Sequence, residues 1–130
     1  AIHAGLLAHN HTGSDDEFMK EQGLKYIDAL IVNFYALDEM MADEKANFEM
    51  TRQAIDVGGP SMSHNARKAF IRTALITDPS NYKELIEELE KNNEAISLKM
   101  RLSFKEKQKC RMLKFFNSFR LCISPLVSGC

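Results

Sequence analysis

The sequence has little of what marks secreted, membrane-embedded or metal-binding proteins. Its three cysteines, Cys110, Cys122 and Cys130, are odd in number and match no zinc-ligand spacing. This usage predicts a reduced, cytoplasmic chain without a metal. No apolar run approaches the roughly 20 residues that span a bilayer, and no positively charged leader precedes an apolar segment. We therefore expect neither a membrane anchor nor secretion.

The length of 130 residues predicts a single domain, because no repeat, low-complexity segment or linker divides the chain. The net charge of −1 hides an asymmetry. Residues 1–96 carry nine Lys or Arg against seventeen Asp or Glu, whereas residues 97–130 carry eight basic residues and one acid. A basic end can bind nucleic acid. A solvated helix face is the interpretation we favour, so nucleic-acid binding is not expected.

Strand-like and helix-like segments alternate along the chain, which predicts an α/β fold with a parallel sheet and right-handed crossovers. The expected strands are Ile27 to Phe34, apolar on both faces and therefore buried, and Thr73 to Thr77. Ser14, with Glu17 three residues later, has the form of a capping box, and Ser80 is placed to cap another helix. The expected helices are Ser14 to about Gly23, Phe48 to Ala54, Pro60 to Phe70, Tyr82 to Lys91 and Ile96 to Phe119.

An acid, two glycines and a helix-opening proline stand together at Asp56, Gly58, Gly59 and Pro60. This order predicts a turn that exposes backbone N–H groups at a helix N-terminus. Lys68 follows about two helical turns beyond Ser61. A carboxylate, an amine and backbone donors that lie close together can move protons and stabilise an oxyanion. A purely structural turn is the alternative, and this motif alone leaves both open.

Four stretches together resemble the cyclohydrolase domain of the bifunctional purine-biosynthesis enzyme that makes inosine monophosphate. They are Ile2 to His9, Asp28 to Leu37, Arg52 to Phe70 and Asp78 to Tyr82, and their order and spacing agree over about residues 1–104. The resemblance implies a three-layer parallel sheet with flanking helices, similar to methylglyoxal synthase, here incomplete. Residues 105–130 depart from it and are expected to form a divergent, basic, helical tail.

The resemblance also implies a reaction. In this family an imidazole-carboxamide ribonucleotide bearing a formamido group closes its second ring, losing water and giving inosine monophosphate. The carboxamide nitrogen attacks the formyl carbon while charge builds on the formyl oxygen, so the site needs proton transfer, an oxyanion donor and accurate positioning, with no metal or cofactor. By the resemblance, the catalytic residues are Asp56, Lys68 and Tyr35, and the substrate-binding residues are Asn33, Gly58, Gly59 and Ser61. A homodimer is likewise implied.

Each of these residues also has a structural interpretation. Asp56 can stabilise the turn, Lys68 can be a solvated charge, Tyr35 can anchor the sheet and Asn33 can end a strand. His3 aligns with a family histidine, and a structural role for it stays equally open. His9, His11 and His64 form no ligand pair, so no metal site is expected.

The chain also departs from the family pattern. The family has a segment before the residues that match Ala1, with serine- and threonine-rich phosphate loops and a lysine, and a transformylase domain after the cyclohydrolase domain; none of these has a counterpart here. His64 replaces an arginine, and Ala69-Phe70 replace an Asn-His pair. We therefore expect a fragment or the product of a truncated gene, with an exposed parallel sheet edge. The alternative to a ring-closing enzyme is a catalytically inactive remnant that acts as an interaction or dimerisation piece.

Overall fold

The computed structural model describes residues 1–8, 13–34, 47–53 and 55–107. Its elements, in chain order, are α1 (Ile2–Leu7), α2 (Ser14–Glu21), β1 (Ala29–Ile31), α4 (Phe48–Gln53), α5 (Gly58–Lys68), β2 (Ala74–Ile76), the 3₁₀ turn η1 (Pro79–Asn81) and α6 (Tyr82–Lys91). Residues 98–107 form one further helical stretch. Within these ranges no helix combines the length and the apolar character that crossing a bilayer requires.

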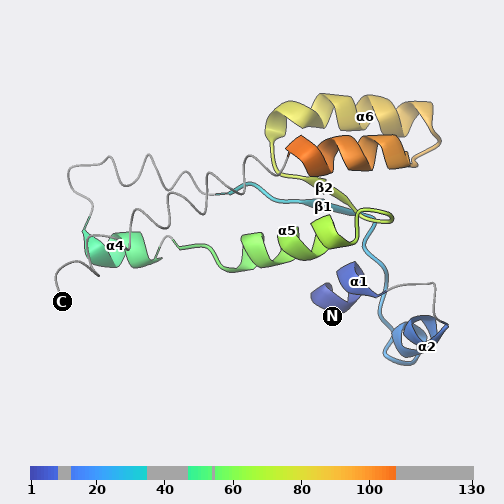
Figure 1. Ribbon diagram of the computed structural model, residues 1–130, viewed down its shortest axis with the longest axis horizontal. Helices are drawn as coiled ribbons and strands as arrows, with labels where there is room; N and C mark the ends of the chain where they lie inside the picture. The colour runs from blue at the N-terminus through green and yellow to red at the C-terminus, as the bar shows by residue number, and fades with distance from the viewer. Residues whose placement is uncertain (9–12, 35–46, 54, 108–130) are drawn as a thin grey trace.

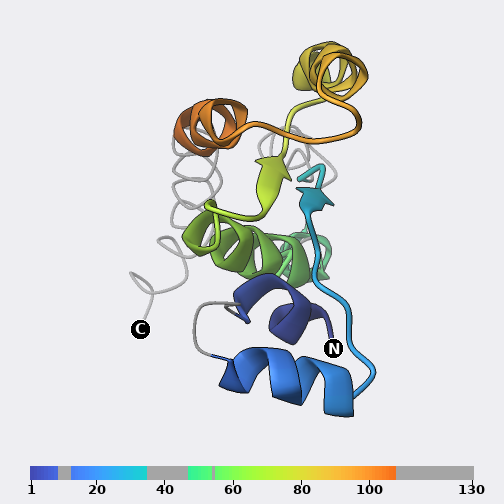
Figure 2. The same cartoon turned by 90° about the vertical axis from the view of Figure 1, so that its right-hand side faces the viewer.

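Helices cover both faces of a small parallel sheet. β1 and β2 pair in the register Ala29↔Ala74, Leu30↔Leu75 and Ile31↔Ile76. The helical stretch 98–107 and α6 lie on one face of the strands and α5 on the other (Figure 1). Beyond α5 come α1 and then α2, as the side view shows (Figure 2). The predicted α/β class and parallel pairing are therefore confirmed, in a sheet of two strands among the described residues.

The core consists of two clusters, one on each side of β2. Successive side chains of a strand point to opposite faces. Ala74 and Ile76 accordingly pack with Leu85 of α6 and Phe104, while Leu75 packs on the other face. Its partners there are Leu6 of α1 and Ala66 of α5. β2 is thus covered on both faces, and α5 packs against one of them through Ala66.

The two predicted strands are shorter in the structure than in the sequence pattern. Only three residues of the apolar run 27–34 form strand, and Asp78-Pro79 ends the partner strand because η1 starts there. A ladder of hydrogen bonds needs two paired strands, so it ends where one of the strands turns away from the other. The expectation that this run is buried on both faces is wrong, since Ala29 and Ile31 are exposed. β1 pairs along one edge only within the described chain.

Three helix termini differ from prediction. α5 begins at Gly58, two residues before Pro60. α2 begins at Ser14 itself with Gly13 at its N-cap and without a side-chain capping bond, although its end near Gly23, at a φ of 61°, is confirmed. Ser80 does not cap by its side chain: its backbone N–H donates to the carboxylate of Asp78, 2.9 Å away. Asp78, two residues earlier, is therefore the residue whose side chain caps this turn.

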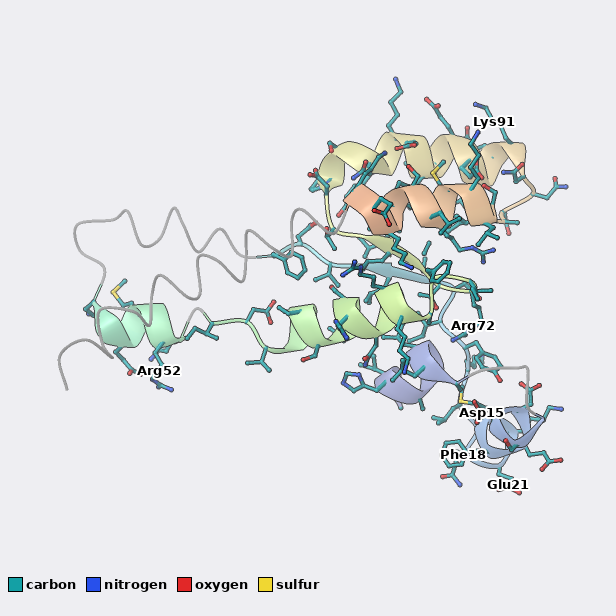
Figure 3. All side chains as sticks on the ribbon, in the orientation of Figure 1. Asp15, Phe18, Glu21, Arg52, Arg72 and Lys91 are labelled. Atoms are coloured by element: carbon teal, nitrogen blue, oxygen red, sulfur yellow. The ribbon has the colours of Figure 1, made fainter. Side chains whose placement is uncertain are left out.

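Arg72 fastens α1, a helix that the sequence patterns did not predict, to the rest of the fold. It lies in the connection from α5 to β2 and extends toward α1 (Figure 3). Its guanidinium donates to the carbonyl oxygens of Gly5 and Leu6 at 2.9 and 3.0 Å and lies 4.4 Å from the ring centroid of Tyr26. Carbonyls at a helix C-terminus lack intrahelical partners, and a cation satisfies them well.

The boundary predicted between residues 104 and 105 falls inside a helix. Phe104 is fully buried, and the helical stretch 98–107 continues past it without a break. Lys105 places its ammonium 3.6 Å from the ring centroid of Phe70, and Lys107 pairs with Glu84 at 2.6 Å. Residues 108–130, including the three cysteines, lie outside the described residues, so the role of the tail stays a prediction.

Candidate functional site

The N-terminus of α5 lies on the same side of the fold as the carboxyl ends of both strands (Figure 1). A right-handed crossover from β1 through α5 to β2 makes the helix run opposite to the strands, as Figure 1 shows. A methyl group added to Gly59 would lie 3.2 Å from Cγ1 of Val32, the residue that follows β1. Ligands of open α/β sheets bind at this edge. We call the polar groups there, Asn33, Asp56, Gly58, Gly59 and Tyr82, the carboxyl-edge cluster.

Asp56 holds the first turn of α5. Its Oδ1 accepts a hydrogen bond from the backbone N–H of Gly59 at 3.0 Å. The negative charge that the helix N-terminus favours is therefore the protein's own carboxylate. The turn-stabilising role considered for Asp56 is confirmed, and it leaves Oδ2 without a hydrogen bond from the described residues. That oxygen is free to accept a proton or a hydrogen bond from a ligand.

The two glycines of the motif have different surroundings. Gly59 is buried, and a Cβ there would overlap Oδ2 of Asp56. Gly58 is exposed, and a Cβ there would lie 3.9 Å from Oδ1 of Asp56, an ordinary contact. Gly59 is thus required for the carboxylate to lie against the backbone, whereas Gly58 is not. Ser61 is exposed in the first turn, with its backbone N–H donating to the carbonyl of Val57.

Asn33 lies two residues beyond β1 and accepts a hydrogen bond from the hydroxyl of Tyr82 at 3.1 Å. Tyr82 is the first residue of α6, and its ring packs against the core cluster that contains Ile76 and Leu85. The sequence patterns placed Tyr82 only within a resembling stretch and assigned it no part in the site. Its position at the start of the helix that follows the second strand, after the turn η1, was the signal that could have found it.

Lys68 is at the other end of α5 from Asp56. The helix runs from Gly58 to Lys68, which corresponds to about 15 Å of axial rise. The expectation that this amine lies close to Asp56 and the backbone donors is wrong within one chain, because the intervening residues are continuously helical. Lys68 is exposed at the amino-end side of the strands. Tyr35 lies outside the described residues.

The described part of the chain contains no group of three His, Cys, Asp or Glu side chains that could hold a metal ion. His3 has a protein partner instead, since its Nδ1 is 2.6 Å from Nδ2 of Asn65 on α5. This contact joins α1 to α5, which fits the structural role considered for His3. His64 is exposed, and His9 and His11 lie outside the described residues.

Comparisons with known proteins point to one group of relatives. No protein-family model matches the chain. The bifunctional purine biosynthesis protein PurH of Xanthomonas campestris is 37% identical over 102 residues, which is 78% of this chain and 19% of that protein. PurH of Polynucleobacter necessarius is 32% identical over 106 residues, which is 82% of this chain and 20% of that protein. The chain therefore spans about a fifth of the length of the curated relatives that it matches.

A solved structure agrees with the fold. The crystal structure of ForH superimposes with a TM-score of 0.81 at 27% identity, covering 94% of this chain and 62% of that chain. The correspondence thus extends over nearly the whole sequence.

Proposed function

Because this chain is homologous to a region of the bifunctional purine biosynthesis protein PurH, we propose that it carries the ring-closing, inosine-monophosphate cyclohydrolase chemistry of purine biosynthesis. The observation that supports this is the carboxyl-edge cluster. Asn33 and Asp56, assigned by resemblance, come from segments 23 residues apart. Asn33 follows Val32, whose Cγ1 lies 3.2 Å from a Cβ built on Gly59, and Gly59 donates its N–H to Asp56. Both segments therefore lie on the side of the sheet where α/β proteins bind ligands. A cytoplasmic location, in which the cysteines stay reduced, is part of this proposal.

In the proposed mechanism, three groups of the carboxyl-edge cluster each have one role: substrate orientation, proton transfer and stabilisation of the oxyanion. Asn33 binds the carboxamide of the substrate and orients its nitrogen toward the formyl carbon. The free oxygen of Asp56 takes a proton from that weakly nucleophilic nitrogen as the N–C bond forms and returns it to the formyl oxygen. That oxygen then leaves as water, with the proton of the formamido nitrogen, as the C=N bond forms. Gly59 N–H already serves Asp56, so Gly58 N–H is the proposed donor to the formyl oxygen, where negative charge develops before water leaves. Ser61 and Tyr35 complete the substrate contacts.

Lys68 takes part in this mechanism only across a subunit boundary. The length of α5 separates it from Asp56 by about 15 Å of helix rise in one chain, and a reacting atom has to be within about 3 Å of both groups. We therefore propose that Lys68 reaches the substrate bound by a second copy, in the homodimer that the resemblance implies. Mixing an Asp56→Ala chain with a Lys68→Ala chain should then restore turnover that neither variant has alone. Two inactive variants that stay inactive when mixed would contradict this arrangement.

The ring-closure assay tests the main proposal. Purified chain is mixed with the formamido substrate, and inosine monophosphate is followed by absorbance against a no-enzyme control. Asp56→Ala should reduce turnover by about a hundredfold or more, as expected when a proton-transfer group is lost. Asp28→Ala is the matched control, because Asp28 is an exposed acid at the opposite end of β1. No turnover above background, or equal turnover in both variants, would contradict the proposal.

A second candidate function is an inactive remnant that pairs with a full-length PurH-type subunit. The outer edge of β1 supports it, because Ile31 is 53% exposed there and the strand pairs only with β2 within the described residues. Unpaired strand edges are templates for strand addition. Co-purification with a full-length cyclohydrolase that is lost in Ile31→Lys would favour this function. A monomer that ignores that subunit would count against it.

A further inference from the structure

Tyr82 determines which end of the Asn33 side chain is available to a ligand. An asparagine amide has an oxygen that accepts hydrogen bonds and an NH₂ group that donates them. The Tyr82 hydroxyl is 3.1 Å from Oδ1 of Asn33 and donates to it. This leaves both N–H bonds of Nδ2 for another partner. The amide oxygen is already occupied, so a ligand that needs an acceptor at this point would have to break a hydrogen bond.

The rest of the fold holds the Tyr82 hydroxyl in place. The carboxylate of Asp78 closes the turn η1 by accepting from the N–H of Ser80, and α6 begins directly after that turn. The Tyr82 ring packs against the core cluster of Ala74, Ile76, Leu85 and Phe104. Asn33 is fixed from the other side, because the N–H of Val32 donates to the carbonyl of Ile76 at 2.9 Å. Both partners of the hydrogen bond are therefore attached to β2.

We propose that Tyr82 is a positioning residue that makes Asn33 a hydrogen-bond donor, and that the chain thereby selects purine nucleotides with a 6-oxo group over those with a 6-amino group. This inference rests on the proposed function. The 6-oxo group of inosine monophosphate is the carboxamide oxygen of the ring-closing substrate, so one contact serves both. A donor at that oxygen also draws electron density from the adjacent nitrogen, which eases the loss of its proton.

The selection follows from the cost of an unpaired polar group. A 6-amino group would direct its own N–H bonds at the NH₂ group of Asn33, and both sets of donors would lose water without gaining a partner. Sites built to pair one hydrogen-bonding group reject its counterpart for this reason. Without the Tyr82 hydroxyl the Asn33 amide is free to turn over and present its oxygen, so the discrimination should weaken.

The test compares two nucleotides on three forms of the full chain. Equilibrium binding of inosine monophosphate and adenosine monophosphate is measured by calorimetry for the unaltered chain, Tyr82→Phe and Tyr26→Phe. We expect Tyr82→Phe to lower the affinity ratio in favour of inosine monophosphate by roughly five- to tenfold, the value of one hydrogen bond. Tyr26→Phe is the matched control, since its hydroxyl bonds Asp16 on α2 and the ratio should not change.

Each result has one meaning. An unaltered chain that binds neither nucleotide would overturn the proposed function and this inference together. Binding of inosine monophosphate with the same ratio in Tyr82→Phe would overturn the inference alone. If Tyr82→Phe does not fold, Asn33→Asp replaces it, because a carboxylate still accepts from Tyr82 but cannot donate to the ligand. That variant should lose inosine monophosphate and gain relative affinity for adenosine monophosphate; an unchanged preference would again overturn the inference.

Discussion

The two strands of this protein have the same three residues, Ala-Leu-Ile, and opposite surroundings. β2 (Ala74–Ile76) is buried at every position, whereas β1 (Ala29–Ile31) is exposed at both ends and half-buried at its centre. Ile76 is completely inaccessible and Ile31 is 53% exposed. An identical local sequence is thus fully buried in one case and largely exposed in the other.

The difference comes from what covers each strand. α6 and the helical stretch 98–107 place Leu85 and Phe104 on one face of β2, and α5 and α1 place Ala66 and Leu6 on the other. Of the three residues of β1, Leu30 is the one that packs as a partly buried side chain against a core cluster. Strand-forming tendency and burial are therefore separate properties, because the first is local and the second depends on neighbours.

The largest expected effect is the contrast between Ile76→Ala and Ile31→Ala. Removing the same atoms should destabilise the protein by about 2–5 kcal/mol at position 76, where a cavity remains. At position 31 the loss should be about 0.5 kcal/mol, because the side chain already contacts water. Denaturant unfolding of both variants measures the two values. Equal losses would mean that the β1 edge is covered in solution.

The second prediction contrasts Gly59 with Gly58, at the N-terminus of α5. Gly59→Ala should destabilise the protein by about 1–3 kcal/mol, because the new methyl group overlaps Asp56 and crowds Val32. It should also weaken binding of inosine monophosphate by displacing the carboxylate. Gly58→Ala has room for the methyl group and should change stability by no more than about 0.5 kcal/mol. Thermal melts and calorimetry on both variants check this; equal behaviour would show that Asp56 does not lie against Gly59.

The third prediction concerns Asp78, in the segment that follows β2, where we expect a smaller loss of stability. Asp78→Ala removes the carboxylate that accepts from Ser80, and loss of such a cap should destabilise by about 1 kcal/mol. Because this turn positions Tyr82, the preference for the 6-oxo nucleotide should fall as well. Ser80→Ala keeps the backbone donor and should change neither property. A larger loss in Ser80→Ala, measured by thermal unfolding, would restore the capping role that the sequence predicted for Ser80.

The smallest expected effect is a pH dependence in α6, the helix whose Leu85 packs against Ala74 and Ile76 of β2. Hydrogen bonds from Ser97 lower the pKa of Glu88 below its ordinary value of 4.5. A depressed folded-state pKa stabilises the protein fully above about pH 4.5, and this contribution disappears as the pH falls through the folded-state value. The melting-temperature difference between the unaltered chain and Glu88→Gln should therefore shrink on acidification. A difference that is independent of pH would contradict this prediction.

The sequence predicted more of the fold than of the site. Its alternation of strand and helix signals gave the parallel α/β arrangement, and the proline and glycines placed the start of α5 within two residues. The resemblance also assigned Asn33 and Asp56 to the site, and these assignments stay predictions; the structure shows that Val32, next to Asn33, lies beside Gly59, the hydrogen-bond partner of Asp56. The sequence patterns missed α1, whose six residues depend on Arg72 for a tertiary anchor that no local pattern reveals.

The sequence analysis also failed to predict which residues lie close together in the folded protein. Lys68 follows Asp56 closely in the sequence, yet an unbroken helix carries it to the opposite end of the sheet. Tyr82 is far from Asn33 in the sequence, yet the parallel pairing of β1 with β2 brings their side chains to 3.1 Å. Sequence spacing predicts proximity only within a helical turn or a strand, so contacts between elements need the fold.

The sequence by itself determined the local elements: the glycine-rich entry to α5, the parallel-strand tripeptides and the homology to PurH. These depend on backbone preferences and residue order, which are written in a short stretch of chain. Only the tertiary structure decided that one Ala-Leu-Ile is buried and the other exposed, that Asp56 accepts a hydrogen bond from its own helix, and that Tyr82 donates one to Asn33. Burial and side-chain hydrogen bonds are properties of neighbours, and neighbours exist only once the helices have packed on the sheet.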